Sequence, residues 1–220
     1  MKINWEHIFQ NKYNYLLTTQ ILIFVAYPLL TSAHLKFPII PLLLLISITP
    51  ALWVGLSRRV FLVVISVGIL AFILNLVMDV TNVTDAAIQL LLLLYAAFYF
   101  MAIVILIKKI SSDTIVTADT IKGGISIYIL LGLFWSVLYM IILTYNAEAF
   151  TNIPEPEITG SFDCFYYSFI TLTTLGYGDI APAAKYARIL AIMEAVTGPV
   201  YLAIFVAQII GLNIARKLKD

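Results

Sequence analysis

Long apolar segments recur along the chain, and they constrain its fold more than any other feature. Residues 86–107 contain no charged side chain, and a helix that crosses a bilayer needs about 20 mostly apolar residues in a row. With 62% hydrophobic and 11% charged residues, the chain also has too little polar surface to cover a soluble globule. The sequence therefore predicts an all-α membrane protein with six transmembrane helices. The other five are expected at residues 15–32, 37–56, 60–78, 125–143 and 184–212.

Lysine and arginine near the ends of these segments predict the orientation, because basic residues concentrate on the cytoplasmic side. Under an alternating topology, Arg58 and Arg59, Lys108 and Lys109, and the basic carboxyl tail fall on the same side. We therefore expect a multi-pass protein of the cell membrane with both termini in the cytoplasm. A cleavable signal peptide ending near residues 31–33 is a weaker alternative, because that segment is long enough to span.

A short polar run lies between the last two apolar segments. It reads Thr173-Thr174-Leu175-Gly176-Tyr177-Gly178-Asp179. A pore that selects potassium must replace the ion's hydration water with oxygens at fixed spacing, and the backbone carbonyls of an extended strand supply them. Pointing successive carbonyls to one side requires alternate residues in the left-handed region, which glycine reaches without a Cβ clash. The alternating glycines at 176 and 178 fit that geometry.

This run resembles the potassium-channel signature, and the resemblance extends over roughly residues 125–211. It implies a re-entrant pore helix at residues 166–173 and a selectivity filter at residues 174–178. The ion-binding groups that it implies are the carbonyls of Thr174, Leu175, Gly176 and Tyr177 together with the Thr174 hydroxyl. Gly178 completes the filter, Thr173 supports it, and Asp179 followed by Pro182 closes the outer mouth.

Two positions depart from the family pattern. Leu175 stands where valine or isoleucine is usual, which keeps the carbonyl but changes the packing behind it. Ile170 stands where some members carry a glutamate that faces the aspartate after the filter, so that carboxyl pair is absent here.

One filter strand cannot surround an ion, so a single pore loop per chain implies a homotetramer. The expected function is passive potassium conduction through this tetrameric pore. The implied partners are potassium ions and membrane lipid, with no nucleic acid and no cofactor other than K⁺ in the filter. Gly198-Pro199 lies in the last segment and is a candidate gate hinge, because proline removes a helical hydrogen bond and glycine eases bending. A fixed kink is the alternative.

Four helices before a two-helix pore resemble the six-segment, voltage-gated-like cation channels, here of prokaryotic type. The expected domains are a four-helix block (residues 1–109), a cytoplasmic linker (110–122) and a pore domain (123–220). We expect the linker to form a helix along the inner membrane surface, with Gly123-Gly124 turning the chain upward. Residues 86–107 lack the repeated arginines that move in a membrane field, so strong voltage gating is not expected.

Other functions remain open from the sequence. A less selective monovalent cation channel is the nearest, because of Leu175, and a non-conducting or regulatory channel subunit is another. A potassium uptake transporter would usually carry four pore-like repeats where this chain has one. An enzyme is not expected, because His7 and His34 have no recognisable nucleophile or carboxylate partner.

Overall fold

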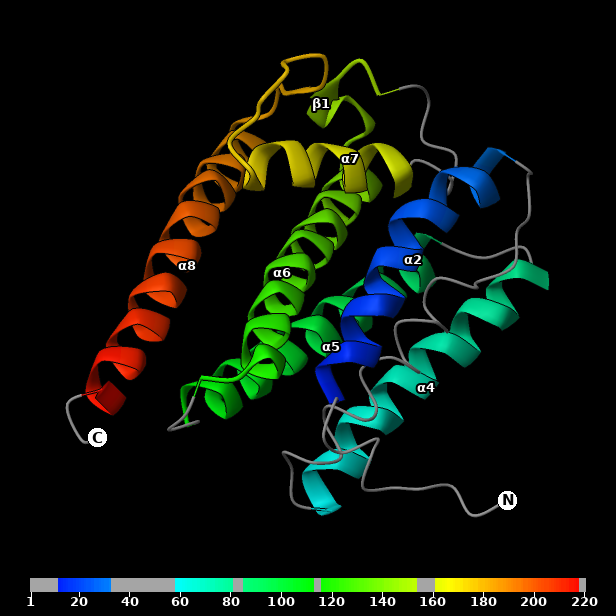
Figure 1. Ribbon diagram of the computed structural model, residues 1–220. Helices are drawn as coiled ribbons and strands as arrows, with labels where there is room; N and C mark the ends of the chain where they lie inside the picture. The colour runs from blue at the N-terminus through cyan, green and yellow to red at the C-terminus, as the bar shows by residue number, and fades with distance from the viewer. Residues whose placement is uncertain (1–11, 33–57, 81–84, 113–115, 154–160, 218–220) are drawn as a thin grey trace.

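The computed structural model of the chain is almost entirely helical (Figure 1). It describes residues 12–32, 58–80, 85–112, 116–153 and 161–217. The elements are α2 (Lys12–Ser32), α4 (Arg58–Val80), α5 (Asp85–Ser111), α6 (Ala118–Tyr145), the 3-10 helix η1 (Ala147–Ala149), β1 (Phe150–Thr151), α7 (Ser161–Leu172), β2 (Ala181–Pro182) and α8 (Lys185–Lys217). The span predicted at residues 37–56 lies outside the described residues.

Helix α6 is the centre of the arrangement. It packs against α5 and α2 on one side and against α7 and α8 on the other, while α4 packs against α5. Figure 1 shows the short helix α7 lying across the end of α6 and leading to the top of α8. The main apolar core lies between α2, α5 and α6 and includes Leu16, Leu106 and Leu130, all fully buried. Helices α2 and α5 are therefore joined to α6 within one chain by direct packing.

Three helices are long and apolar enough to cross a membrane, judged by length and composition. They are residues Ala86–Ser111, Ala118–Tyr145 and Lys185–Ile214. Shorter apolar stretches run through α2 at Tyr13–Ala26 and through α4 at Phe61–Leu74. The prediction of a helical membrane protein is thus confirmed in its coarse form, and the number of six spans stays a prediction.

The linker predicted at residues 110–122 does not form a helix of its own in the described part of the chain. Helix α5 continues to Ser111 and α6 already begins at Ala118. The start of α6 is fixed by Thr117, whose hydroxyl accepts from the backbone N–H of Thr120 at 3.2 Å, while the Thr117 N–H donates to the Thr120 hydroxyl. This reciprocal capping satisfies backbone donors at the helix start, so the helix begins before the glycines.

The turn expected at Gly123-Gly124 is wrong, since α6 runs through both residues. The glycines instead permit close packing. A Cβ on Gly124 would overlap the ring of Phe205 in α8, and one on Gly123 would meet Ile110 and Tyr13. The hydroxyl of Tyr201 in α8 also donates to the Gly124 carbonyl oxygen at 2.8 Å. The pair therefore brings α6 close to its neighbours at this end.

Helix α2 reaches the pore helix with an aromatic side chain. The ring of Phe24 lies 5.1 Å from that of Phe165 and 4.8 Å from that of Phe169, centroid to centroid. Between α2 and α6, the buried Gln20 amide donates to the Ser126 carbonyl oxygen at 3.2 Å. A polar side chain buried among helices is held by such a bond because leaving it unpaired is costly.

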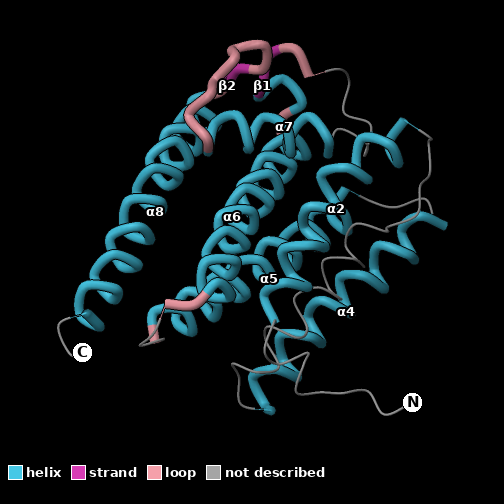
Figure 2. Tube along the Cα trace, in the orientation of Figure 1, coloured by secondary structure: helices cyan, strands magenta, loops and turns pink. Residues whose placement is uncertain are grey.

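The two short strands hold the loop that follows the filter. β1 pairs antiparallel with β2, with Phe150 opposite Pro182 and Thr151 opposite Ala181. Figure 2 shows this loop and both strands above the ends of α6 and α8. The backbone N–H groups of Ala183 and Ala184 also donate to the Ala149 carbonyl oxygen. The C-terminal end of the segment between α7 and α8 is thereby anchored.

Candidate functional site

The five residues predicted to form the filter lie together in one segment directly after α7. Its backbone alternates as the sequence predicted, with positive φ at Gly176 (52°) and Gly178 (79°). Thr174 also has a positive φ, of 60°, which the sequence did not reveal. Alternation of ordinary and left-handed residues turns successive carbonyls toward the same side of a strand. Positions 174, 176 and 178 therefore share one repeating geometry.

The C-terminal end of α7 holds the start of this segment. The Ile170 carbonyl oxygen accepts from the backbone N–H groups of Leu175 and Gly176, at 2.9 and 3.0 Å. The Thr174 N–H donates to the Thr171 carbonyl oxygen at 3.0 Å. The Thr173 hydroxyl donates to the Phe169 carbonyl oxygen, four residues earlier, at 2.6 Å, and its supporting role stays a prediction. The partial negative charge at a helix C-terminus favours a cation nearby.

Every residue from 173 to 179 is exposed on the single chain. Leu175 is 55% and Tyr177 67% exposed, and a Cβ built on Gly176 or Gly178 would meet no atom within 4 Å. The described part of this chain therefore provides no brace for Tyr177. The filter segment presents an uncovered edge along its whole length.

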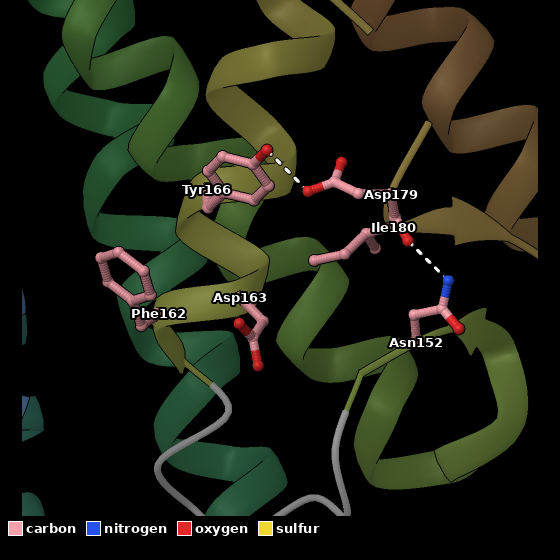
Figure 3. Close-up of a pocket in the computed structure, with 6 residues that line it drawn as sticks. All are labelled: Asn152, Phe162, Asp163, Tyr166, Asp179 and Ile180. Atoms are coloured by element: carbon pink, nitrogen blue, oxygen red, sulfur yellow. Dashed lines mark hydrogen bonds between the residues drawn. The ribbon is translucent and has the colours of Figure 1, made fainter. Parts of the chain in front are cut away.

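A tyrosine of the pore helix contacts the aspartate that follows the filter. The Tyr166 hydroxyl donates to Asp179 Oδ2 at 2.7 Å, and the Asn152 side-chain amide donates to the Asp179 carbonyl oxygen at 2.7 Å. Figure 3 shows both bonds at the edge of an open pocket, whose other lining residues are Phe162, Asp163 and Ile180. These bonds fix Asp179 on both its side chain and its backbone.

The same contact shifts two pKa values in opposite directions. The hydrogen bond from Tyr166 lowers the pKa of Asp179 below its ordinary value, because the bond stabilises the carboxylate. It raises the pKa of Tyr166 to about 12, with smaller contributions from burial and from the Asp179 charge. Asp179 is thus kept as an anion directly after the predicted filter.

Sequence reasoning missed this contact. At the position where some related channels carry a glutamate, this chain has Ile170, so the sequence predicts no partner for Asp179 from there. The partner is Tyr166, one helical turn earlier on the same helix, and its side chain supplies a hydroxyl donor instead of a carboxyl. The spacing of one turn between Tyr166 and Ile170 was the available signal, because residues four apart share a helix face.

Gly198 and Pro199 lie inside α8, which Figure 1 shows as one continuous helix. A Cβ on Gly198 would overlap the Leu172 carbonyl oxygen at the end of α7. The Tyr128 hydroxyl donates to the same oxygen at 3.0 Å. Gly198 therefore has a packing role at the base of the filter, and hinge motion stays a prediction.

No group of histidine, cysteine, aspartate or glutamate side chains placed to hold a metal ion occurs among the described residues. The polar atoms that gather at the site are backbone carbonyls and hydroxyls. Such oxygens suit alkali cations that exchange rapidly more than a tightly held transition metal.

Comparison with known proteins agrees with the geometry. Residues 115–214 match the family model described as "Ion channel". The voltage-gated potassium channel Kch of Escherichia coli (strain K12) is 30% identical over 113 residues, which is 51% of this chain and 25% of that protein. The two-pore potassium channel 4 of Arabidopsis thaliana is 40% identical over 71 residues, 30% of this chain and 25% of that protein.

The match to an archaeal relative covers a larger share of that relative's length. The hyperpolarization-activated voltage-gated potassium channel of Methanocaldococcus jannaschii is 26% identical over 123 residues, 53% of this chain and 57% of that protein. The chain thus spans between about a quarter and little more than half of the curated relatives named here. No solved structure matches the chain significantly.

The matched region contains α6, α7, the filter segment and α8, so the resemblance inferred from the signature is confirmed. The match is to a family of ion channels, and three helices of this chain are long and apolar enough to cross a membrane. Residues 115–214 are thus similar to the ion channel family, and the chain resembles prokaryotic potassium channels of that superfamily.

Proposed function

We propose that the chain is the subunit of a potassium-selective channel that conducts K⁺ passively through a pore made by four copies. The observation that carries the proposal is the positive φ at 174, 176 and 178, in the segment that follows α7. That alternation would align the carbonyls of Thr174, Leu175, Gly176 and Tyr177 along one edge, where K⁺ exchanges its hydration water for them. The potassium-channel names of the relatives point the same way.

Two uncovered surfaces support the tetramer. The filter edge is exposed over residues 173–179, and one side of α8 exposes a run of large apolar side chains. Among them are Ile189, Ile192, Val196, Val200 and Ile204. Copies of the chain packed around an axis would cover much of this surface, and lipid would cover the outer helices. The filter then becomes a ring of oxygens, which a single strand cannot form.

The proposal also includes the membrane topology and the passive transport that the sequence predicts. Both termini lie in the cytoplasm and the protein crosses the membrane six times. Transport is passive, without catalysis and without a cofactor beyond the permeant K⁺. Asp179 at the outer mouth would raise the local cation concentration, an effect that salt screens within about 10 Å at 0.1 M.

The experiment that tests the proposal is ion flux through the purified full chain in liposomes, with outward gradients of K⁺ and of Na⁺ measured separately. We expect K⁺ efflux that far exceeds Na⁺ efflux, and loss of the preference in Gly178→Asp, which alters the filter. Equal K⁺ and Na⁺ fluxes would instead identify a less selective cation channel. No flux of either ion from a correctly folded oligomer would identify a non-conducting subunit.

A further inference from the structure

A carboxyl side chain is fully buried inside the pore region, at Glu194 in the first half of α8. Its neighbours Ile192 and Met193 are exposed on the other side of the helix. Glu194 therefore belongs to the face of α8 that packs against α6 and α7, behind the filter segment. The filter chemistry described above makes no use of this group.

Glu194 joins three helices through its two oxygens. Oε2 accepts from the Tyr139 hydroxyl of α6 at 2.5 Å, and Oε1 lies 2.5 Å from the Ser168 hydroxyl of α7. All three side chains are buried, with Tyr139 and Ser168 also fully enclosed. A polar network of this kind specifies one packing of the helices, because each member is costly to leave unpaired.

The groups that face Glu194 from the neighbouring helices carry no positive charge. From α6 they are Tyr128 and Tyr139, and from α7 they are Tyr167 and Ser168. Cys164 of α7 lies near the Tyr139 hydroxyl. On α8 itself Arg188, six positions earlier, donates from Nε to the Pro182 carbonyl oxygen at 3.0 Å. A buried carboxylate here would lack a cation among the described residues, and an unpaired buried charge is strongly unfavourable.

The number of hydrogens available for these contacts indicates whether the Glu194 carboxyl group is protonated. Ser168 Oγ lies 2.7 Å from the Gly132 carbonyl oxygen as well as 2.5 Å from Glu194 Oε1. A carbonyl oxygen only accepts, and a serine hydroxyl has one hydrogen to donate. If Ser168 gives that hydrogen to Gly132, the short contact with Oε1 needs a proton from the carboxyl group. A neutral Glu194 satisfies all three contacts, whereas a carboxylate leaves one pair of oxygens without a hydrogen between them.

We propose that Glu194 is a neutral carboxylic acid and acts as the positioning residue of the pore helix. It donates from Oε1 to Ser168 Oγ, Ser168 donates to the Gly132 carbonyl oxygen, and Tyr139 donates to Oε2. This chain of bonds fixes α7 between α6 and α8. Ser168 lies one helical turn before Leu172, which meets Gly198 and precedes the filter.

The consequence for conduction rests on the proposed channel function. Removing the proton would place a charge in a buried site with no cation among the described groups, and it would break the bond from Oε1 to Ser168. The contribution of the network to stability is present while Glu194 is protonated and is lost as the pH rises through its ionisation. Displacement of α7 would then disturb the filter and stop conduction at alkaline pH.

The protonation state is tested by infrared difference spectroscopy of the full chain in lipid at neutral pH, comparing wild type with Glu194→Gln. We expect the carbonyl stretch of a protonated carboxylic acid in wild type, its absence in Glu194→Gln, and a shifted band in Ser168→Ala, which removes one hydrogen-bond partner. A carboxylate band in place of the acid band would overturn the proposal. This readout needs no conduction, so it separates the proposal from the proposed function.

The positioning role is tested by K⁺ flux and thermal unfolding over a range of pH. The amide of Glu194→Gln still donates to Ser168 and accepts from Tyr139, so we expect neutral-pH flux within about twofold of wild type, and no loss at alkaline pH. Glu194→Leu leaves the buried Tyr139 hydroxyl without an acceptor and removes the donor to Ser168 Oγ, so it should lower flux about tenfold or more, given the cost of buried unsatisfied groups. Identical alkaline responses of wild type and Glu194→Gln, or unaltered flux in Glu194→Leu, would overturn the positioning role.

Discussion

The residues of the filter depend on backbone angles more than on side-chain contacts. Gly178 has a φ of 79°, where a side chain costs about 1–2 kcal/mol. We predict that Gly178→Ala lowers the ratio of K⁺ to Na⁺ permeability, because relief of that strain moves the carbonyls off their common edge. Reversal potentials under bi-ionic conditions measure the ratio, and an unchanged ratio would show that the angle at 178 does not determine selectivity.

The contact between Tyr166 and Asp179 predicts a pH dependence at the outer mouth. The pKa of Asp179 is below its ordinary value. The attraction of cations by the Asp179 carboxylate is therefore fully present above the ordinary pKa, and it is lost as the pH falls through the lowered pKa. Tyr166→Phe removes the 2.7 Å bond, and Asp179 should then gain its proton at a higher pH.

The measurement is the K⁺ current as the external solution is acidified. We expect the current of Tyr166→Phe to fall at a higher pH than that of wild type. Tyr145→Phe is the control, since it removes a hydroxyl from a 69% exposed tyrosine at the end of α6. Superimposable pH curves for Tyr166→Phe and wild type would contradict the role of the bond.

For individual residues, the sequence predicted the alternating backbone angles of the filter segment but not the hydrogen bonds around it. Gly176 and Gly178 are visible as glycines at alternate positions, whereas Thr174 adopts the same left-handed region without a residue type that indicates it. The bonds of Tyr166 to Asp179 and of Glu194 to Ser168 join residues 13 and 26 positions apart. Such pairs depend on how α7 sits between the filter and α8, which no local pattern encodes.

Among the secondary-structure elements, α8 contacts the end of α7 immediately before the filter segment. A methyl group at Gly198 would overlap the Leu172 carbonyl oxygen. We predict that Gly198→Ala destabilises the protein by about 1–3 kcal/mol, as overpacking typically does. It should also alter gating and, because Leu172 precedes the filter, ion preference.

Thermal unfolding and single-channel recording measure both effects. Gly211→Ala is the matched control in the same helix, where a Cβ would meet no atom within 4 Å. There the higher helix propensity of alanine should stabilise α8 by up to about 1 kcal/mol. Equal stabilities of the two variants would contradict the packing role, and normal open probability in Gly198→Ala would leave the Gly198-Pro199 pair without a role as a hinge.

Helix positions were predictable because apolar length defines them, but helix ends were not. The expected pore helix began at residue 166, whereas α7 begins at Ser161, and α6 begins at Ala118 in place of residue 125. The flexibility of glycine predicts a turn at Gly123-Gly124, but both residues lie inside α6, where Gly124 packs against Phe205. Sequence propensity is a weak guide where a neighbouring helix approaches this closely.

For the whole molecule, we predict weak voltage dependence despite the six-segment layout that the sequence predicts. One charge crossing the field contributes about 2.3 kcal/mol per 100 mV. Three charges per subunit of a tetramer would contribute on the order of 28 kcal/mol by the same principle. Residues 86–107 carry no charge to move, and Lys108 and Lys109 lie in the last turn of α5.

Macroscopic currents over a wide voltage range in symmetric K⁺ check this expectation. A nearly voltage-independent conductance is expected for wild type and for the variant with both lysines changed to glutamine. A steep sigmoidal conductance curve that flattens in this double variant would show that Lys108 and Lys109 sense voltage. Helix α5 would then act as a sensor in addition to packing against α6.

The most direct test of the proposed pore is to locate the ion among the four chains. Tl⁺ substitutes for K⁺ and scatters X-rays anomalously, so crystals grown in Tl⁺ would reveal each occupied position. We predict a row of anomalous peaks on a fourfold axis, each ringed by oxygens of Thr174, Leu175, Gly176 and Tyr177 from four copies. Peaks away from these carbonyls, or an assembly without four copies around the axis, would contradict the proposed pore.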